Sequence, residues 1–214
     1  MKENIKRKLE NLLIRISPLQ RLINSDGLNE TFEIIKKKYP QIIIHNFNSG
    51  EKVEDWEVPK AWKVIKGQIL DSKKNIISSI DDNILLVAPY SESVKGWFTK
   101  NEIKKHLRTR KDKPNDYLLE HRNAYDYNLK TWGITLPFNV WNNLKDEKYF
   151  IDIEVEWKEN PMKVGEIFIQ GETDKVVCFT AHIDELCNDD LSGCVVGLEY
   201  FNSLKERFNL KYSY

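Results

Sequence analysis

The sequence has no surplus of charge of either sign. Lysine and arginine together number 33, as do aspartate and glutamate, so the formal net charge is zero. A balanced chain has no general electrostatic attraction to nucleic acid or to an anionic membrane surface. We therefore expect neither of these as a partner.

Cysteines and long apolar runs are also scarce. The three cysteines are an odd number, which without a secretory signal favours reduced thiols over a disulfide framework. Residues 1–15 are charged throughout and contain no signal-peptide core. No apolar run approaches the roughly 18 residues that a membrane helix needs. These absences predict a soluble, cytoplasmic protein.

The first fifty residues have helical and then strand-like patterns. With 41% apolar residues, the chain can build a core for one large or two small domains. Apolar spacing predicts helices over 3–16 and 28–38, the second beginning near Gly27 and Asn29. Residues 41–47 alternate as a strand does.

The middle of the chain predicts short strands separated by turns. Strands are expected over 62–70, 76–80 and 84–90, and a short helix over 101–108 with Asn101 as its N-cap. The six tryptophans could line a sugar-binding face, but aromatic residues in small β domains more often form the core.

Residues 149–157 alternate almost without interruption between apolar and polar side chains. Tyr149, Ile151 and Ile153 share one face, whereas Asp152 and Glu154 share the other. This pattern is typical of a half-exposed antiparallel strand, and residues 162–169 could be its neighbour.

The last part of the chain predicts a βαβ unit. Residues 176–181 form a continuous apolar run, as expected for a strand covered on both faces. A helix over 191–207 follows, and residues 210–214 begin another strand-like run.

Three polar residues follow the predicted buried strand and suit a metal site. His182 stands where that strand ends, the edge at which α/β sheets bind ligands. An imidazole and the Asp189 carboxylate are suitable zinc ligands, and Asp184 could orient the ring through its second nitrogen. Gly193, in the first helical turn, would let the backbone come close to the site.

Each of these residues also has a structural interpretation. A single histidine at a strand end is usually structural, and Asp190 and Ser192 are more simply helix caps. Cys178 and Cys194 fall on apolar elements and suit core thiols, because no C-x-x-C spacing supports a Cys/His zinc site. The other histidines, for which no acidic or cysteine partner is evident, are interpreted as surface or packing residues: His45, His106 and His121.

His182-x-Asp184, followed by Asn-Asp-Asp-Leu-Ser-Gly over 188–193, resembles the first half of the site of two-zinc exopeptidases of the bacterial leucyl aminopeptidase type. Further stretches resemble an uncharacterised aminopeptidase-like group with an inserted domain of unknown function. They are SDGLNETFEII (25–35), VEDWEVPKAW (53–62), KTWGI (130–134) and GEIFI (165–169).

The resemblance implies an α/β fold, an incomplete aminopeptidase-like (phosphorylase/hydrolase-type) mixed sheet with helices. Residues 1–55 and 158–214 would form this domain, and residues 56–157 an inserted β-rich domain. The loop after His182 is shorter than the group's usual one. The family's catalytic glutamate and later metal ligands would lie beyond residue 214.

The resemblance also implies a zinc-dependent hydrolase of peptide or related amide bonds, catalytically incomplete within residues 1–214. His182 and Asp189 would be ligands for one or two zinc ions, and Asp184 would orient His182. The alternative is a non-catalytic binding protein on a peptidase-like scaffold, whose β-rich insertion binds a partner or glycan. The substrate would be a peptide or small amide, and the sequence leaves the oligomeric state open.

Overall fold

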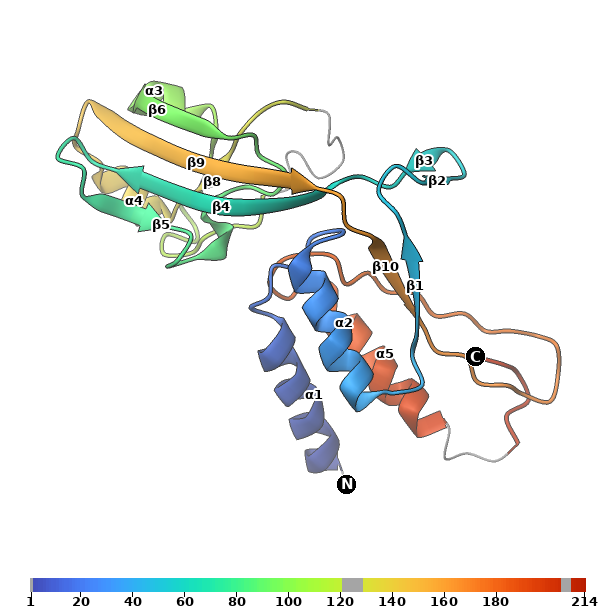
Figure 1. Ribbon diagram of the computed structural model, residues 1–214. Coiled ribbons are helices and arrows are strands. Elements are labelled where there is room, and N and C mark those ends of the chain that lie inside the picture. The colour runs from blue at the N-terminus through green and yellow to red at the C-terminus, as the bar shows by residue number, and fades with distance from the viewer. Residues whose placement is uncertain (1, 121–128, 205–208) are drawn as a thin grey trace. The chain divides into compact units, whose positions relative to one another are not determined.

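The computed structural model describes residues 2–120, 129–204 and 209–214 and divides into two compact units. The first unit contains Met1–Ala61 and Glu159–Tyr214, and the second contains Trp62–Lys158 (Figure 1). His121 and the predicted helix end at residue 207 lie outside the described residues.

Three helices form the centre of the first unit. They are α1 (Lys2–Ile16), α2 (Asp26–Lys38) and α5 (Leu191–Leu204). Helix α2 begins at Asp26, slightly before the start expected near Gly27 and Asn29, and its N-cap is Ser25, whose Oγ accepts a hydrogen bond from the Leu28 backbone N–H at 3.0 Å. A hydroxyl is preferred there because it satisfies an N–H that has no partner within the helix.

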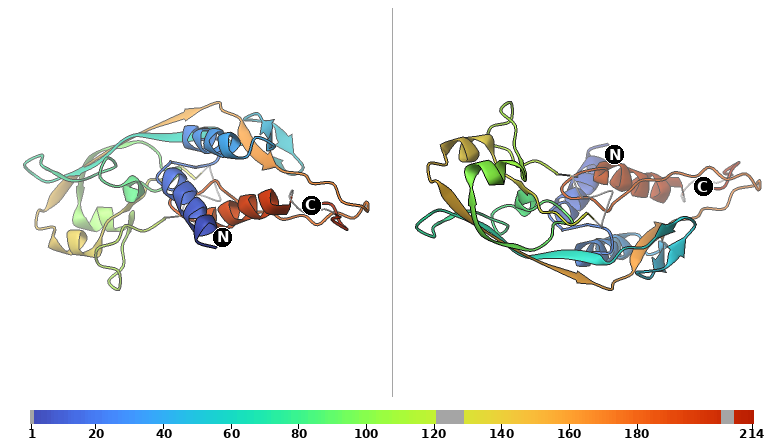
Figure 2. Two further views of the ribbon diagram at one scale, coloured as in Figure 1. Left: turned by 90° about the horizontal axis from the view of Figure 1, so that it is seen from below. Right: turned by 90° about the horizontal axis from the view of Figure 1, so that it is seen from above.

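The core of the first unit joins helices from opposite ends of the sequence. Helix α1 packs against α5, as the views in Figure 2 also show. The predicted apolar spacings place their side chains in one buried cluster. Its members are Leu12, Ile16, Leu28, Phe32, Ile35, Tyr39, Ile42, Leu191 and Val195.

A two-stranded antiparallel sheet flanks these helices. Strand β1 (Ile43–Phe47) pairs with β10 (Met162–Glu166). A small hairpin of β2 (Lys52–Val53) and β3 (Trp56–Glu57) follows β1. The expectation that residues 162–169 would pair with the strand over 149–157 is wrong. Pro161 separates the two strands, and a proline has no N–H to donate to a ladder.

The predicted buried strand over 176–181 is not a strand within the described residues. Val176 forms one isolated parallel bridge with Ser213, and Val176 and Phe179 are 59% and 57% exposed. A strand that is buried on both faces needs neighbours at its edges and covering layers above and below. The described part of the chain supplies only the bridge to Ser213, so the apolar run stays at the surface.

The second unit is built on a four-stranded sheet in the order β5-β4-β9-β6. These strands are β4 (Ala61–Leu70), β5 (Ile76–Ser79), β6 (Val94–Thr99) and β9 (Lys148–Lys158). Tyr149, Ile151 and Ile153 of β9 are buried, as their alternation predicted. Asp152 is buried too, against expectation, because Lys66 and Lys95 pair with its carboxylate.

Short elements complete the second unit. Residues 84–90, predicted as a strand, begin as the 3-10 helix η1 (Ile84–Leu86). Helix α3 (Lys100–Lys104) is capped by Thr99, which forms a reciprocal capping box with Glu102, and not by Asn101. The remaining elements are β7 (Leu107–Arg108), which pairs in parallel with β8 (Ile134–Thr135), and α4 (Phe138–Asn143).

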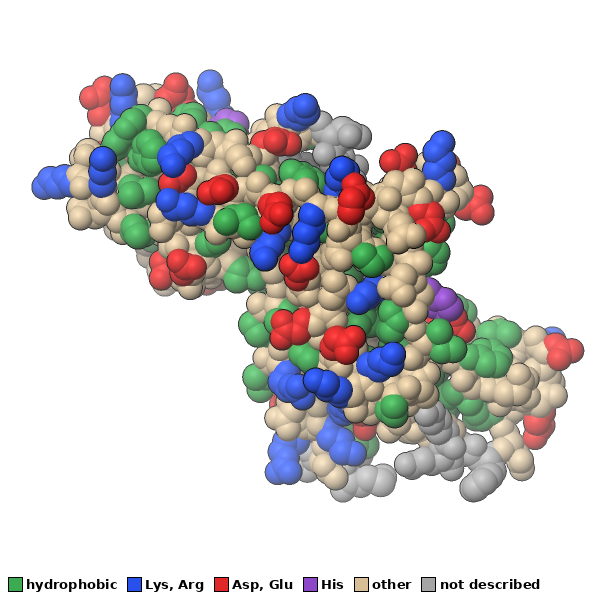
Figure 3. Space-filling model, viewed as in Figure 1, with side chains coloured by type: hydrophobic (Ala, Val, Ile, Leu, Met, Phe, Trp, Pro, Cys, Tyr) green, Lys and Arg blue, Asp and Glu red, His purple; other side chains and the backbone are tan. Residues whose placement is uncertain are grey.

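Acidic and basic side chains are interspersed over the face in Figure 3, as the balanced composition predicts. Among the described residues, no helix is both long and apolar enough to cross a membrane.

Candidate metal site

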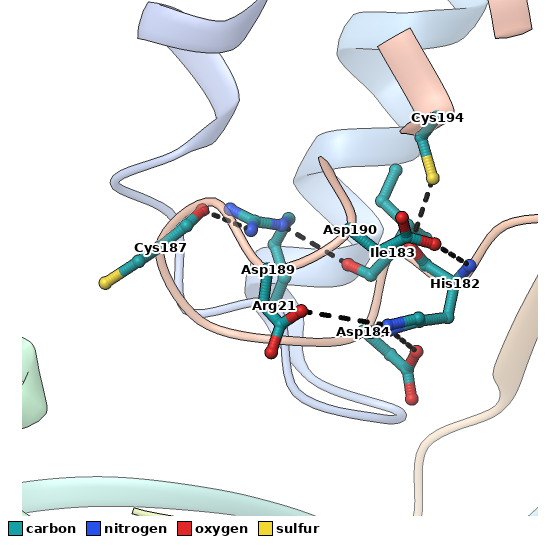
Figure 4. Close-up of polar contacts among 8 residues, drawn as sticks. All are labelled: Arg21, His182, Ile183, Asp184, Cys187, Asp189, Asp190 and Cys194. Carbon is teal, nitrogen blue, oxygen red and sulfur yellow. Dashed lines mark hydrogen bonds and ion pairs between the residues drawn. The ribbon is translucent and has the colours of Figure 1, made fainter. Parts of the chain in front are cut away.

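The loop before helix α5 brings the predicted site residues together (Figure 4). The His182 backbone is fixed at two atoms: its N–H donates to Asp190 Oδ2 at 3.2 Å, and its carbonyl accepts from Cys194 Sγ at 3.1 Å. The chain therefore folds back on itself, and the first turn of α5 holds the backbone that carries the imidazole.

The imidazole of His182 lies between two carboxylates. Its Nε2 is 4.0 Å from Asp189 Oδ1, and its Nδ1 is 3.5 Å from Asp184 Oδ1. The three side chains are 50%, 44% and 39% exposed, in the order His182, Asp189 and Asp184, so solvent and solutes reach them. One ring nitrogen thus faces each of the two carboxylates.

The separation of His182 and Asp189 comes close to what a shared zinc ion needs. A tetrahedral zinc ion with bonds of about 2.0–2.2 Å would hold a nitrogen and an oxygen ligand about 3.4 Å apart. The observed 4.0 Å exceeds this by about half an ångström, a shift that side-chain rotation can supply. Among the residues in the described ranges, no group of three or more His, Cys, Asp or Glu side chains gathers at a spacing suited to a metal ion.

Asp190 and Gly193 support the loop from the start of α5. The Asp190 carbonyl accepts from the Cys194 N–H at 3.2 Å, which is the backbone role of an N-cap residue. Its carboxylate bonds to the His182 N–H, so Asp190 helps to hold the histidine. A Cβ at Gly193 would lie 2.8 Å from Asp190 Oδ1, so a side chain there would push against this carboxylate.

The cysteines are placed differently from the sequence expectation. Cys178, interpreted as a core thiol, is exposed, and so is Cys187. Cys194 is partly buried, and burial, together with the negative charge of Asp190, raises the pKa of its thiol to about 11. Because the thiolate is the form that binds metals, this pKa disfavours Cys194 as a ligand.

Sequence reasoning missed one residue of this region, Arg21. Its buried guanidinium donates to the carbonyls of Ile183 and Cys187, on the loop between His182 and Asp189 (Figure 4). Arg21 lies in the connection between α1 and α2, more than 160 positions from these partners. No local spacing connects it to the loop, so only the fold reveals the contact.

Two other histidines have partners away from this loop. His45 Nε2 lies 2.7 Å from Glu166 Oε2 across the β1–β10 pair, an acidic partner that sequence spacing did not indicate. The ring of His106 stacks on Trp132 with centroids 4.0 Å apart, which is a packing role as expected.

Known proteins resemble nearly the whole chain. The profile of the DUF4910 family, described as a domain of unknown function, matches residues 10–214. A protein of Clostridium acetobutylicum named "Putative polysaccharide biosynthesis protein with aminopeptidase-like domain" is 31% identical over 212 residues, which cover 97% of this chain and 47% of that protein.

The fold also matches a crystal structure, that of a protein named as a "putative peptidase" from Clostridium acetobutylicum. The TM-score is 0.78 at 29% identity, and the match covers 100% of this chain and 51% of that one. The chain thus spans about half the length of these relatives and shares a mixed α/β scaffold with a protein named as a peptidase. On this evidence the chain belongs to the DUF4910 family of aminopeptidase-like proteins.

Proposed function

We propose that this chain contributes part of the metal centre of a zinc-dependent hydrolase of peptide or related amide bonds. The observation that carries the proposal is the placement of the His182 imidazole between the carboxylates of Asp189 and Asp184. The names of the relatives, which refer to a peptidase and to an aminopeptidase-like domain, support the reaction class.

Each residue has a defined role in this proposal. His182 Nε2 and Asp189 Oδ1 are the ligand atoms, and Asp184 holds the other ring nitrogen, which fixes the tautomer that leaves Nε2 free to coordinate. Asp189 lies two residues before α5, where the positive end of the helix dipole favours the ionised carboxylate. A bound zinc ion would polarise the scissile carbonyl and activate a water molecule.

Two protein ligands are fewer than a catalytic zinc ion takes. Residues 1–214 match only about half of each relative. In this proposal the remaining ligands and the general base come from a segment that corresponds to the other half.

Zinc titration of the chain by calorimetry tests the proposal. We expect weak, saturable binding, which His182→Ala and Asp189→Asn each weaken by at least tenfold because each removes one of two ligands. His45→Ala is the matched control, since His45 is also half-exposed and also faces a carboxylate, that of Glu166. Equal binding by His182→Ala and the unsubstituted chain, or a loss confined to His45→Ala, would exclude this site.

The second candidate function is glycan binding by the β-rich unit. It is favoured by the reference to polysaccharide biosynthesis in one relative's name and by an aromatic pair on adjacent strands, of which Trp97 is exposed and Phe150 is partly buried. Trp97 is 44% exposed, and its ring lies edge-on to that of Phe150 at 5.3 Å. Glycan binding that survives a chelator and is lost in Trp97→Ala would favour this candidate over the hydrolase.

A further inference from the structure

Arg21 is an unusual residue in this molecule because its charged side chain is fully buried, at 0% exposure. It lies in the connection between α1 and α2. Within the described part of the chain, its guanidinium donates hydrogen bonds to five backbone carbonyl oxygens. Burial lowers the pKa of this group, yet an arginine remains protonated in proteins.

Three of the five acceptors are local. Nη1 of Arg21 donates to the carbonyls of Ile16, Ser17 and Leu19, at and just after the end of α1. The last carbonyls of a helix have no partner within the helix, and the guanidinium adds a second donor at Ile16, whose carbonyl also accepts from the Leu19 N–H. These contacts fix where the guanidinium lies.

The other two acceptors belong to the candidate metal site. Nε donates to the Ile183 carbonyl at 3.3 Å, and Nη2 donates to the Cys187 carbonyl at 2.6 Å (Figure 4). Ile183 follows His182 directly, and Cys187 precedes Asp189 by two residues. One rigid, planar group therefore holds both ends of the loop that separates the two candidate ligands.

The loop needs this support because its backbone is strained at Cys187. Cys187 has φ +60°, a left-handed conformation that costs a side-chain-bearing residue free energy and persists only when its surroundings enforce it. Leu186, 1% exposed, anchors the loop on the apolar side, and the guanidinium anchors it on the polar side. A lysine cannot replace the guanidinium here, since its single ammonium is a point charge that lacks the planar arrangement of several N–H donors.

We propose that Arg21 is a positioning residue for this site: through the carbonyls of Ile183 and Cys187 it sets the separation of His182 and Asp189, without itself touching metal or substrate. The part of this inference that concerns zinc rests on the proposed function. The part that concerns the loop stands on the hydrogen bonds alone.

The test compares Arg21→Lys and Arg21→Met with Arg15→Met, an exposed arginine in the last turn of α1. Hydrogen–deuterium exchange of the zinc-free proteins comes first. We expect both Arg21 variants to exchange faster in peptides covering residues 182–190, whereas peptides from the second unit keep their protection. Arg15→Met should exchange at the same rates as the unsubstituted chain. Unchanged exchange over 182–190 in Arg21→Lys and Arg21→Met would overturn the proposal.

Zinc affinity is then measured by calorimetry well below the unfolding temperature of each variant. Positioning predicts a loss of about tenfold in both Arg21 variants, the lower end of what outer-shell partners of metal ligands contribute. A purely structural arginine would lower the unfolding temperature and leave the zinc affinity of the folded protein unchanged, which would overturn the positioning role. If the unsubstituted chain bound no zinc, the proposed function would fail, and the exchange data would still decide whether Arg21 holds the loop.

Discussion

The buried carboxylate of Asp152 gives a prediction that can be worked through quantitatively. Asp152 lies on β9, opposite Lys95 of β6, and its side chain is 9% exposed. Lys66 Nζ on β4 lies 2.6 Å from Oδ2, and Lys95 Nζ lies 3.7 Å from Oδ1. The perturbation is the removal of these two lysines, singly and together, as Lys66→Met and Lys95→Met.

The expected costs follow from exposure. Lys95 is 70% exposed, so Lys95→Met should cost about 0–1 kcal/mol of unfolding free energy, as for other surface ion pairs. Lys66 makes the shorter, charge-assisted bond and should cost about 1–2 kcal/mol, because Lys95 remains to cover the carboxylate. Removing both lysines leaves the buried Asp152 carboxylate without either of these cations, which should cost about 3–5 kcal/mol of unfolding free energy. The two single substitutions should therefore not add.

Urea unfolding followed by tryptophan fluorescence measures these costs. Five of the six tryptophans belong to the second unit, so the signal reports chiefly on the unit that contains Asp152. Adding Asp152→Asn to the double lysine variant should restore much of the loss, because an amide of similar shape leaves no buried charge. Additive single effects, or no recovery with Asp152→Asn, would refute the reasoning.

Two further predictions concern the first unit. Gly27→Ala should destabilise the protein by about 1–3 kcal/mol, because its Cβ would lie 2.3 Å from the Gln20 carbonyl oxygen. Gly197→Ala, with open space around it on α5, should stabilise the protein by up to about 1 kcal/mol. Urea unfolding followed by far-ultraviolet circular dichroism, which reports chiefly on the long helices of this unit, compares the two unfolding free energies. Burial raises the pKa of Cys194 to about 11, so alkylation at pH 8, followed by mass spectrometry, should modify the exposed Cys178 before Cys194. The difference between the two alkylation rates should decrease as the pH approaches 11 and the Cys194 thiolate forms. Equal alkylation rates of the two cysteines at pH 8 would contradict this prediction.

Local sequence patterns identified several elements well because those elements depend on local spacing. The apolar periodicity of residues 3–16 and 28–38 corresponds to α1 and α2, and the alternation over 149–157 to β9. In each case the element needs only another helix or sheet packed against its one apolar face, and it does not matter which segment of the chain provides it.

The same patterns failed where the outcome depended on which neighbours were available. Residues 176–181 have the composition of a buried strand, yet only Ser213 pairs with them in the described residues, and they stay exposed. Asp152 alternates with apolar residues as an exposed position does, yet lysines from both adjacent strands cover it. Sequence alternation assigns a face to a residue, but the neighbouring strands decide whether that face meets water.

The candidate site divides in the same way. The sequence by itself determined which residue types stand near one another: His182, Asp184 and Asp189 are within eight positions, and a short loop before a helix is enough to bring them together. Only the tertiary structure decided that Arg21 supports this loop, because its contacts with residues 183 and 187 require α1, α2 and α5 to pack into one core. Contacts between residues that are close in sequence follow from their spacing, whereas the partners of a buried charge depend on how distant segments pack.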